Sequence, residues 1–250
     1  MQTIDSNGAE PRRAVKLYAI AAFAAGGLAF IPALMAWFTS EELVLFAIVD
    51  VDPFALWSGR DRVPGFFRPL IPMLAWVWCA LFGISAFAFH FLSVALHLVN
   101  SVLVGLVARE LVRYLPGDDP LRWRGWAVAS GGLFWVWPSH SEAVAWIPGL
   151  TDVFAATWVL CSLFAYLAYR NGGGIGLLLA ALAGYGAALC TKEASITLPG
   201  AVGIYELLRV ASQKKLRRDN VIGPLLFGML LAGYFLFRRW LMGVFLGGYG

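Results

Sequence analysis

Long apolar runs separated by short polar stretches are the dominant pattern of this chain. A helix needs roughly 20 apolar residues to cross a hydrocarbon layer about 30 Å thick. The pattern predicts seven transmembrane helices, at residues 15–38, 85–114, 125–138, 149–169, 174–191, 195–209 and 221–242. A shorter run at 69–82 cannot cross alone, so we expect it to lie at the interface or to re-enter. We therefore predict an all-α polytopic bundle that forms one transmembrane domain over residues 1–250.

Composition supports a membrane protein and argues against a soluble one. Hydrophobic residues make up 60% of the chain and charged residues only 14%, whereas soluble domains are about 45–50% apolar. The net charge of +4 comes without a basic amphipathic patch, so we expect no nucleic-acid partner. The first run is longer than a signal-peptide core, and we expect it to be retained as a span.

The distribution of Lys and Arg predicts how the chain is oriented, because these residues collect in cytoplasmic loops. One side of the predicted topology receives 13 of the 19 basic residues: Arg12, Arg13, Lys16, Arg109, Arg113, Arg122, Arg124, Arg170, Arg209, Lys214, Lys215, Arg217 and Arg218. We expect that side, and the amino terminus, to be cytoplasmic. The outer side then holds the other basic residues together with most of the carboxylates.

The first outer loop, residues 39–68, contains two acidic pairs. Glu41 and Glu42 directly follow the first span, and Asp50 and Asp52 lie farther along. Carboxylates at a membrane surface can act as a general base or bind a divalent metal that holds a phosphate. An ordinary solvated loop is the simpler alternative.

The run at 85–114 has a polar face. At 100° per residue, five polar side chains fall within an arc of roughly 100°: His90, Ser93, His97, Asn100 and Ser101. Polar groups at membrane depth normally face a bundle interior or a wet cavity. For His97 and Asn100, hydrogen bonding between helices is at least as good an explanation as contact with a ligand.

A third polar segment, residues 138–152, follows an apolar run that is only about 20 Å long as a helix. His140 and Glu142 would then lie below the outer surface, and Asp152 follows shortly. Irregular polar backbone at such depth implies a cavity that opens outward. A structural His–Glu pair is the alternative.

Lys192 and Glu193 separate two short apolar runs, and Arg238 and Arg239 stand at the outer end of the last one. The ammonium and a guanidinium suit the phosphate of a lipid. The alternatives are a self-neutralising turn at the Lys-Glu pair and arginines that snorkel to the interface.

Together these stretches resemble the C-type glycosyltransferase superfamily, in particular bacterial relatives of the protein O-mannosyltransferases and of the transmembrane-and-tetratricopeptide mannosyltransferases. The resemblance rests on Phe66-Phe67-Arg68-Pro69-Leu70 with the His- and Asn-marked helix after it, on Pro138-Ser139-His140-Ser141-Glu142-Ala143-Val144-Ala145-Trp146 with Thr151-Asp152, and on Lys192-Glu193. Departures from the family pattern are Glu41-Glu42 in place of a pair that begins with Asp, Trp137 in place of His, and Leu150 in place of Arg.

The resemblance implies a polyprenyl-phosphate sugar as donor and a hydroxyl of a protein or glycan as acceptor, on the outer face of a bacterial cytoplasmic membrane. It implies that the catalytic carboxylate lies in the pair Glu41 and Glu42. It also implies that the donor phosphate and its surroundings are bound by Arg68, His90, His140, Glu142, Asp152, Lys192, Glu193 and Arg238. A buried leaving phosphate demands positive charge, which Arg68, Lys192 and Arg238 could provide. A divalent metal could assist, and no other cofactor is implied.

These readings lead us to expect that the loops at 39–68, 139–152 and 191–194 meet at one site. Members of the family continue beyond the seventh span, so we expect this chain to be the amino-terminal part of a longer protein. Two other readings stay open. Intramembrane His, Lys and Glu also suit a transporter or flippase, and the departures from the family motifs also suit an inactive, truncated relative.

Overall fold

The computed structural model describes residues 9–39, 57, 66–113, 119–243 and 245, and all regular structure in that part of the chain is helical. The longer helices are α1 (Ala9–Ala29), α4 (Leu70–Phe82), α5 (Ala86–Arg113), α6 (Pro120–Val136), α8 (Leu150–Arg170), α9 (Ile175–Leu189), α10 (Leu198–Gln213) and α11 (Asp219–Met242). Short helical segments connect them: α2 (Ile31–Leu34), η3 (Pro138–His140), α7 (Ser141–Ala145), η4 (Ile147–Gly149) and η5 (Glu193–Thr197).

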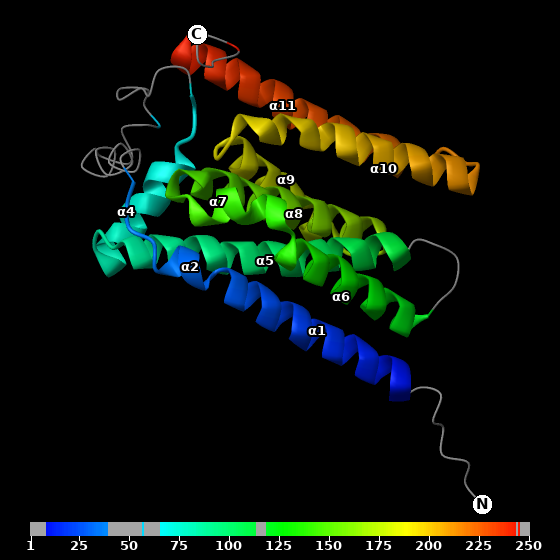
Figure 1. Ribbon diagram of the computed structural model, residues 1–250. Helices are drawn as coiled ribbons and strands as arrows, with labels where there is room; N and C mark the ends of the chain where they lie inside the picture. The colour runs from blue at the N-terminus through cyan, green and yellow to red at the C-terminus, as the bar shows by residue number, and fades with distance from the viewer. Residues whose placement is uncertain (1–8, 40–56, 58–65, 114–118, 244, 246–250) are drawn as a thin grey trace, which may run out of the picture.

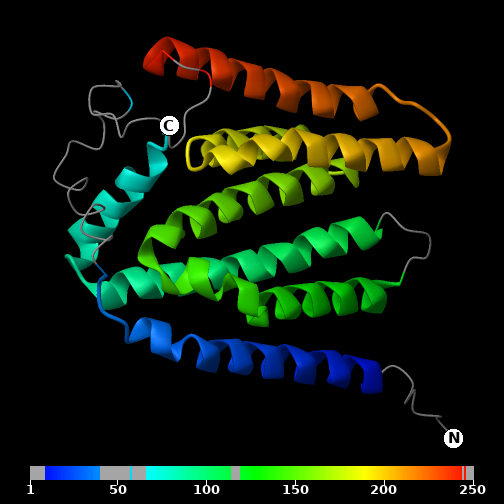
Figure 2. The same ribbon diagram turned by 45° about the horizontal axis from the view of Figure 1, so that its top comes forward.

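The long helices lie side by side in an elongated bundle (Figures 1 and 2). The most extensive contacts join α5 with α6, α8 with α9, α5 with α8, α1 with α6, and α10 with α11. Helix α1 starts at the end of the bundle opposite to the end at which α11 finishes (Figure 1). The bundle therefore has two distinct ends, and from α5 onward the connections between the long helices alternate between them.

In the described part of the chain, three helical segments are long and apolar enough to cross a membrane: Ala86–Arg113, Ile147–Arg170 and Asp219–Met242. In Asp219–Met242 only 22% of the most apolar stretch is buried inside the protein. Most of the hydrophobic surface of this helix therefore faces outward, as expected for a helix in contact with lipid. The predicted all-α membrane helix bundle is confirmed. Seven crossings remain a prediction, since one of the predicted spans, Ile175–Leu189, is a shorter apolar helix. Leu70–Phe82, which we expected to lie at the interface or to re-enter, is also short.

The predicted element boundaries agree with the observed helices to within several residues. The largest difference lies in the first run, expected as one span over 15–38. There α1 begins earlier, at Ala9, and ends at Ala29, and the separate turn α2 contains Pro32 among its first residues. Proline favours the first turn of a helix because its missing N–H needs no partner there, which explains why a new helix starts at this point.

Two glycines allow α5 and α6 to approach closely. A Cβ atom at Gly131 would lie 2.7 Å from the carbonyl oxygen of Ser101, and one at Gly105 would lie 2.6 Å from that of Ala127. The Ser101 hydroxyl also donates a 2.7 Å hydrogen bond to the Gly131 carbonyl. Small residues at such positions are typical of helix packing in membranes.

The main core lies between α8, α9, α10 and α11. Tyr166, Tyr185 and Phe227 are fully buried there, with the Tyr185 and Phe227 rings stacked at 5.2 Å. Phe67, which precedes α4, belongs to the same core and contacts Tyr234 and Phe237 of α11 at ring distances of 6.2 and 5.7 Å. The core thus fixes the segment before α4 against the end of α11.

Candidate functional site

A carboxylate between two guanidinium groups marks one end of the bundle. Glu193, at the start of η5, accepts from Arg68, with Nε and a terminal nitrogen of that arginine each 2.8 Å from Oε2. On its other side, a terminal nitrogen of Arg238 in α11 lies 3.8 Å from Oε1. The Arg238 side chain is only 1% exposed. Three segments that are far apart in the sequence therefore meet at this carboxylate.

Local backbone contacts explain why these segments meet. Helix α9 ends at Leu189, and the carbonyl of Cys190 just after it accepts a 3.2 Å hydrogen bond from the amide of Leu70, the first residue of α4. Arg68 is thereby held beside the connection between α9 and η5. The Phe66 ring lies under the Arg68 guanidinium, 4.2 Å from Cζ to the ring centroid, a distance at which cation and ring attract.

A second ion pair adjoins the first, because Lys192 is the neighbour of Glu193. The Lys192 ammonium contacts the carboxylate of Asp152, which lies in the first turn of α8. Both side chains are partly exposed, 26% for Lys192 and 50% for Asp152. We call these five residues the acid–base cluster: Arg68, Asp152, Lys192, Glu193 and Arg238.

The acid–base cluster contains three cations and two carboxylates, so its formal charge is +1. Charge-assisted hydrogen bonds from Arg and Lys are the strong interactions by which proteins hold phosphate. With Arg238 buried, its field is less screened by water than that of a surface arginine. The cluster can accept one further negative charge without leaving an excess of anions.

The structure brings together five of the eight residues that we expected to surround a donor phosphate, from loops 39–68 and 191–194, the start of α8, and α11. The structure also places the side chains of the adjacent residues Arg238 and Arg239 in different environments. Arg239 is exposed and donates a 2.6 Å hydrogen bond to the carbonyl of Gly243. A helix turns by 100° per residue, so only one of two adjacent arginines can face the bundle interior.

His140 and Glu142 lie in a different environment. The His140 ring contacts Phe134 and His97 at centroid distances of 4.3 and 5.4 Å, and its Nδ1 lies 3.1 Å from the Phe134 carbonyl. Glu142 is exposed in the first turn of α7. A cavity of about 190 Å³ adjoins this segment, lined by Phe30, Trp135, Pro138, Ser141 and others. It does not include the acid–base cluster.

The polar face of α5 turns inward, as predicted, with all five side chains buried. Three of them bond to backbone carbonyls of neighbouring helices: His97 Nε2 lies 3.3 Å from the Trp135 oxygen, Asn100 donates to Val153 at 2.8 Å, and Ser101 donates to Gly131. The helix–helix alternative is thus confirmed for His97 and Asn100. His90 is buried on the same helix.

Four acidic residues of the first outer loop lie outside the described residues: Glu41, Glu42, Asp50 and Asp52. Within the described part of the chain, no three His, Cys, Asp or Glu side chains are grouped so that they could hold a metal ion. The catalytic pair and a divalent metal therefore both stay predictions.

A buried network at the opposite end of the bundle was not predicted. The carboxylate of Glu206 in α10 accepts from the Tyr166 hydroxyl at 2.7 Å, from Arg170 at 2.7 and 3.0 Å, and from the Asn220 amide at 2.6 Å. It therefore joins α8, α10 and α11. The sequence signal was a glutamate inside an apolar run, which membrane burial would make costly without partners.

A neighbouring network joins α5 to the end of α8. Glu110 accepts from Arg113 at 3.0 and 3.1 Å and from the side-chain amide of Asn171 at 3.0 Å. Arg209 of α10 donates to the Tyr205 hydroxyl at 2.7 Å. The distribution of basic residues predicts only a cytoplasmic location for Arg113, Arg170 and Arg209, whereas the structure also gives them carboxylate or hydroxyl partners.

The chain is 35% identical over 148 residues to protein O-mannosyl-transferase Tmtc1 of Drosophila melanogaster, which covers 58% of the chain and 16% of that protein. It is 29% identical over 170 residues to human TMTC1, covering 63% and 18%, and 31% identical over 179 residues to human TMTC4, covering 64% and 24%.

No family model matches the sequence, and no solved structure matches it. The chain spans about a sixth to a quarter of the length of these curated relatives. Over somewhat more than half of its own length, it is similar to the protein O-mannosyl-transferases of animals.

Proposed function

We propose that this chain forms the donor-binding region of a membrane glycosyltransferase, which transfers mannose from a polyprenyl phosphate to a hydroxyl of a protein. The observation that carries the proposal is the acid–base cluster, in which Arg68, Lys192 and Arg238 meet at one end of a membrane bundle. The relatives named as protein O-mannosyl-transferases support mannose as the sugar and protein as the acceptor.

The cluster suits the leaving group of such a reaction. The acceptor oxygen bonds to the anomeric carbon of the sugar, a base takes the hydroxyl proton, and the bond from that carbon to the phosphate oxygen breaks with its electron pair. The phosphate gains negative charge as it leaves. Positive groups already held in place stabilise that charge without reorganisation, and here Glu193 and Asp152 hold the three cations in place.

Glu41 and Glu42 are our candidates for the base, from their place just after the first span. The C-type superfamily and a bacterial cytoplasmic membrane rest on the motif resemblance. The outward orientation rests on the basic side of the bundle lying opposite the acid–base cluster.

Transfer of labelled mannose from a polyprenyl-phosphate mannose to a peptide with Ser and Thr tests this proposal. Membranes from cells that express the full-length protein containing this chain should transfer label above membranes that lack it, and Arg68→Gln should reduce transfer at least about tenfold, because a charge-assisted bond to phosphate is lost. Arg239→Gln is the matched control and should transfer normally. Absence of transfer by the full-length parent protein would reject the proposed activity.

A further inference from the structure

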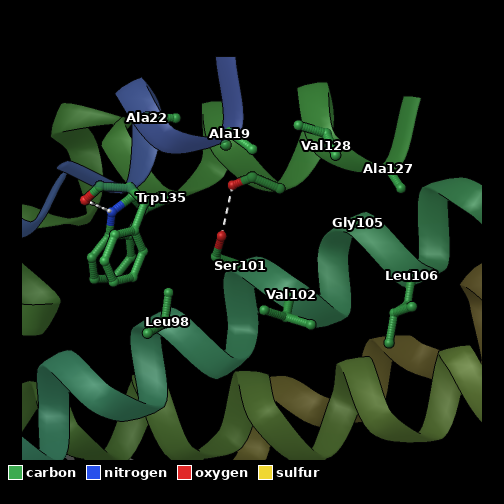
Figure 3. A pocket seen from close by; sticks show the side chains of 13 residues that line it. Ala19, Ala22, Leu98, Ser101, Val102, Gly105, Leu106, Ala127, Val128 and Trp135 are labelled. Carbon is green, nitrogen blue, oxygen red and sulfur yellow. Dashed lines mark hydrogen bonds between the residues drawn. The ribbon is translucent and has the colours of Figure 1, made fainter. Parts of the chain in front are cut away.

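An open groove on the side of the bundle lies far from the acid–base cluster. It runs between α1, α5 and α6 and has a volume of about 300 Å³. Figure 3 shows its wall of small side chains. Among the lining residues are Ala19, Ala22, Gly105, Ala127, Gly131 and Gly132.

The polar side-chain groups in the groove lining, those of Ser101 and Trp135, already donate hydrogen bonds to backbone carbonyls. The hydroxyl of Ser101 donates across the groove wall to the Gly131 carbonyl, as the dashed line in Figure 3 shows. The Trp135 indole N–H, at the end of the groove, donates to the Phe23 carbonyl at 3.3 Å. Apolar cavities without free polar partners stay dry. In a membrane, a groove of this kind is filled by hydrocarbon, which restores the dispersion contacts that an empty space would lack.

The volume fits part of one lipid chain. At about 30 Å³ for a group of the size of water or a methylene, 300 Å³ holds roughly ten such groups. The acyl chains of lipids consist of such methylene groups. Because α5, which lines the groove, is long enough to cross the bilayer, the groove can lie at the depth of these chains.

Three cations surround one mouth of the groove, one from each helix. Lys16 precedes Ala19 by three residues, Arg124 precedes Ala127 by three, and Arg109 follows Leu106 by three. Residues three apart share a helix face, so each cation lies one turn beyond the lining. Helix α5 runs opposite to α1 and α6 (Figures 1 and 2), which places all three turns at the same end.

These cations are available to a ligand. Lys16 and Arg124 are exposed and Arg109 is half-buried. Among the residues that the structure describes, no ion pair involves any of the three. This contrasts with Arg113 and Arg170 nearby, which are paired with Glu110 and Glu206.

We propose that this groove binds one anionic phospholipid from the leaflet on the basic side of the bundle. One acyl chain lies in the groove between α1, α5 and α6, and the phosphate of the headgroup lies among Lys16, Arg109 and Arg124. The observations behind it are the apolar lining of the groove, its volume and the cation on each of its three helices. The site is separate from the acid–base cluster, so it stands whether or not that cluster binds a sugar donor.

Thermal unfolding of the purified chain in detergent tests this site, with dioleoyl phosphatidylglycerol or dioleoyl phosphatidylcholine added. The anionic lipid should raise the midpoint by about 3 °C or more above the zwitterionic one, since a ligand that binds only the folded state stabilises it. The triple variant Lys16→Gln, Arg109→Gln, Arg124→Gln should lose this difference. The control Lys214→Gln, Lys215→Gln, Arg218→Gln removes equal charge from the same end and should keep it.

A second variant tests the groove itself. Val102 lines the groove and is 56% exposed, so Val102→Trp should fill it and abolish the lipid-specific difference, whereas Val99→Trp, on the same helix but outside the lining, should not. The proposal is overturned if both triple variants lose the effect equally, which would show general surface attraction. It is also overturned if inorganic phosphate gives the same rise, or if Val102→Trp leaves it intact.

Discussion

At the scale of single residues, the most informative feature is the choice between adjacent arginines at the end of α11. Residue type alone allows either Arg238 or Arg239 to contact a phosphate or to snorkel, and we expected Arg238 at the donor phosphate. The structure buries Arg238 beside Glu193 and leaves Arg239 exposed. No pattern of residue types distinguishes them, because the choice depends on the rotation of α11 about its axis as it packs against α10, α9 and Phe67.

The carboxylates of the first outer loop give a residue-scale prediction. A general base must be held rigidly toward the reacting atoms, and Glu41 and Glu42 directly follow the first span whereas Asp50 and Asp52 lie farther along the loop. Glu41→Gln with Glu42→Gln should lower mannose transfer by at least about 10²-fold, the low end for loss of a general base. Asp50→Asn with Asp52→Asn should change it little; the reverse ranking would show that the base lies in the aspartate pair.

Glu206 gives a second prediction at this scale. Its carboxylate accepts hydrogen bonds from Tyr166, Arg170 and Asn220, and its side chain is only 3% exposed. Removing one partner of a buried ion pair leaves the other uncompensated, at a cost of about 3–5 kcal/mol. Glu206→Ala should therefore lower the free energy of unfolding by that amount in a denaturant titration.

Asp219 is the control for Glu206, since it contacts the same Arg170 at 3.7 Å but is 58% exposed. Exposed pairs contribute about 0–1 kcal/mol, so Asp219→Asn should cost little. Equal losses for the two substitutions would mean that burial of the Glu206 network does not determine its contribution.

At the scale of elements, the close approach of α5 and α6 forms one wall of the groove. Gly131→Ala would place a methyl group against the backbone of Ser101, and such overpacking costs about 1–3 kcal/mol. Gly125→Ala, on the same helix, meets nothing within 4 Å and should be neutral or stabilising by up to about 1 kcal/mol. Thermal unfolding of both variants measures the difference, and a loss at Gly125 as large as at Gly131 would exclude close helix contact as the cause.

The helices themselves were predictable from the sequence because long apolar runs have few alternatives in a bilayer. The extent of α5 agrees with the expected 85–114 to within a residue. Side-chain pairing was less predictable. The sequence leaves His97 and Asn100 with two interpretations and gives no indication of the partners of Glu206, because these contacts join residues 14 to 53 positions apart and depend on how each helix is rotated.

At the scale of the whole molecule, the two ends of the bundle differ in chemistry. The end with Lys16, Arg109 and Arg124 holds most basic residues, and the acid–base cluster lies at the other. With Cys79, Cys161 and Cys190 replaced by Ser, a single cysteine at Asp152 should react with a membrane-impermeant maleimide in intact cells. A cysteine at Lys214 should react only after lysis, because basic residues favour the cytoplasmic side. The opposite labelling would invert the topology.

Binding of a radiolabelled polyprenyl-phosphate mannose to the purified chain tests the role of the acid–base cluster most directly. The parent chain should bind it, and Arg238→Gln should weaken binding at least about tenfold through loss of a charge-assisted contact with the phosphate, with Arg68→Gln as a second, less buried variant. Arg239→Gln removes the same charge one residue away and should bind as the parent does. Equal binding by all four proteins, each checked for folding by thermal unfolding, would contradict a donor site at the cluster.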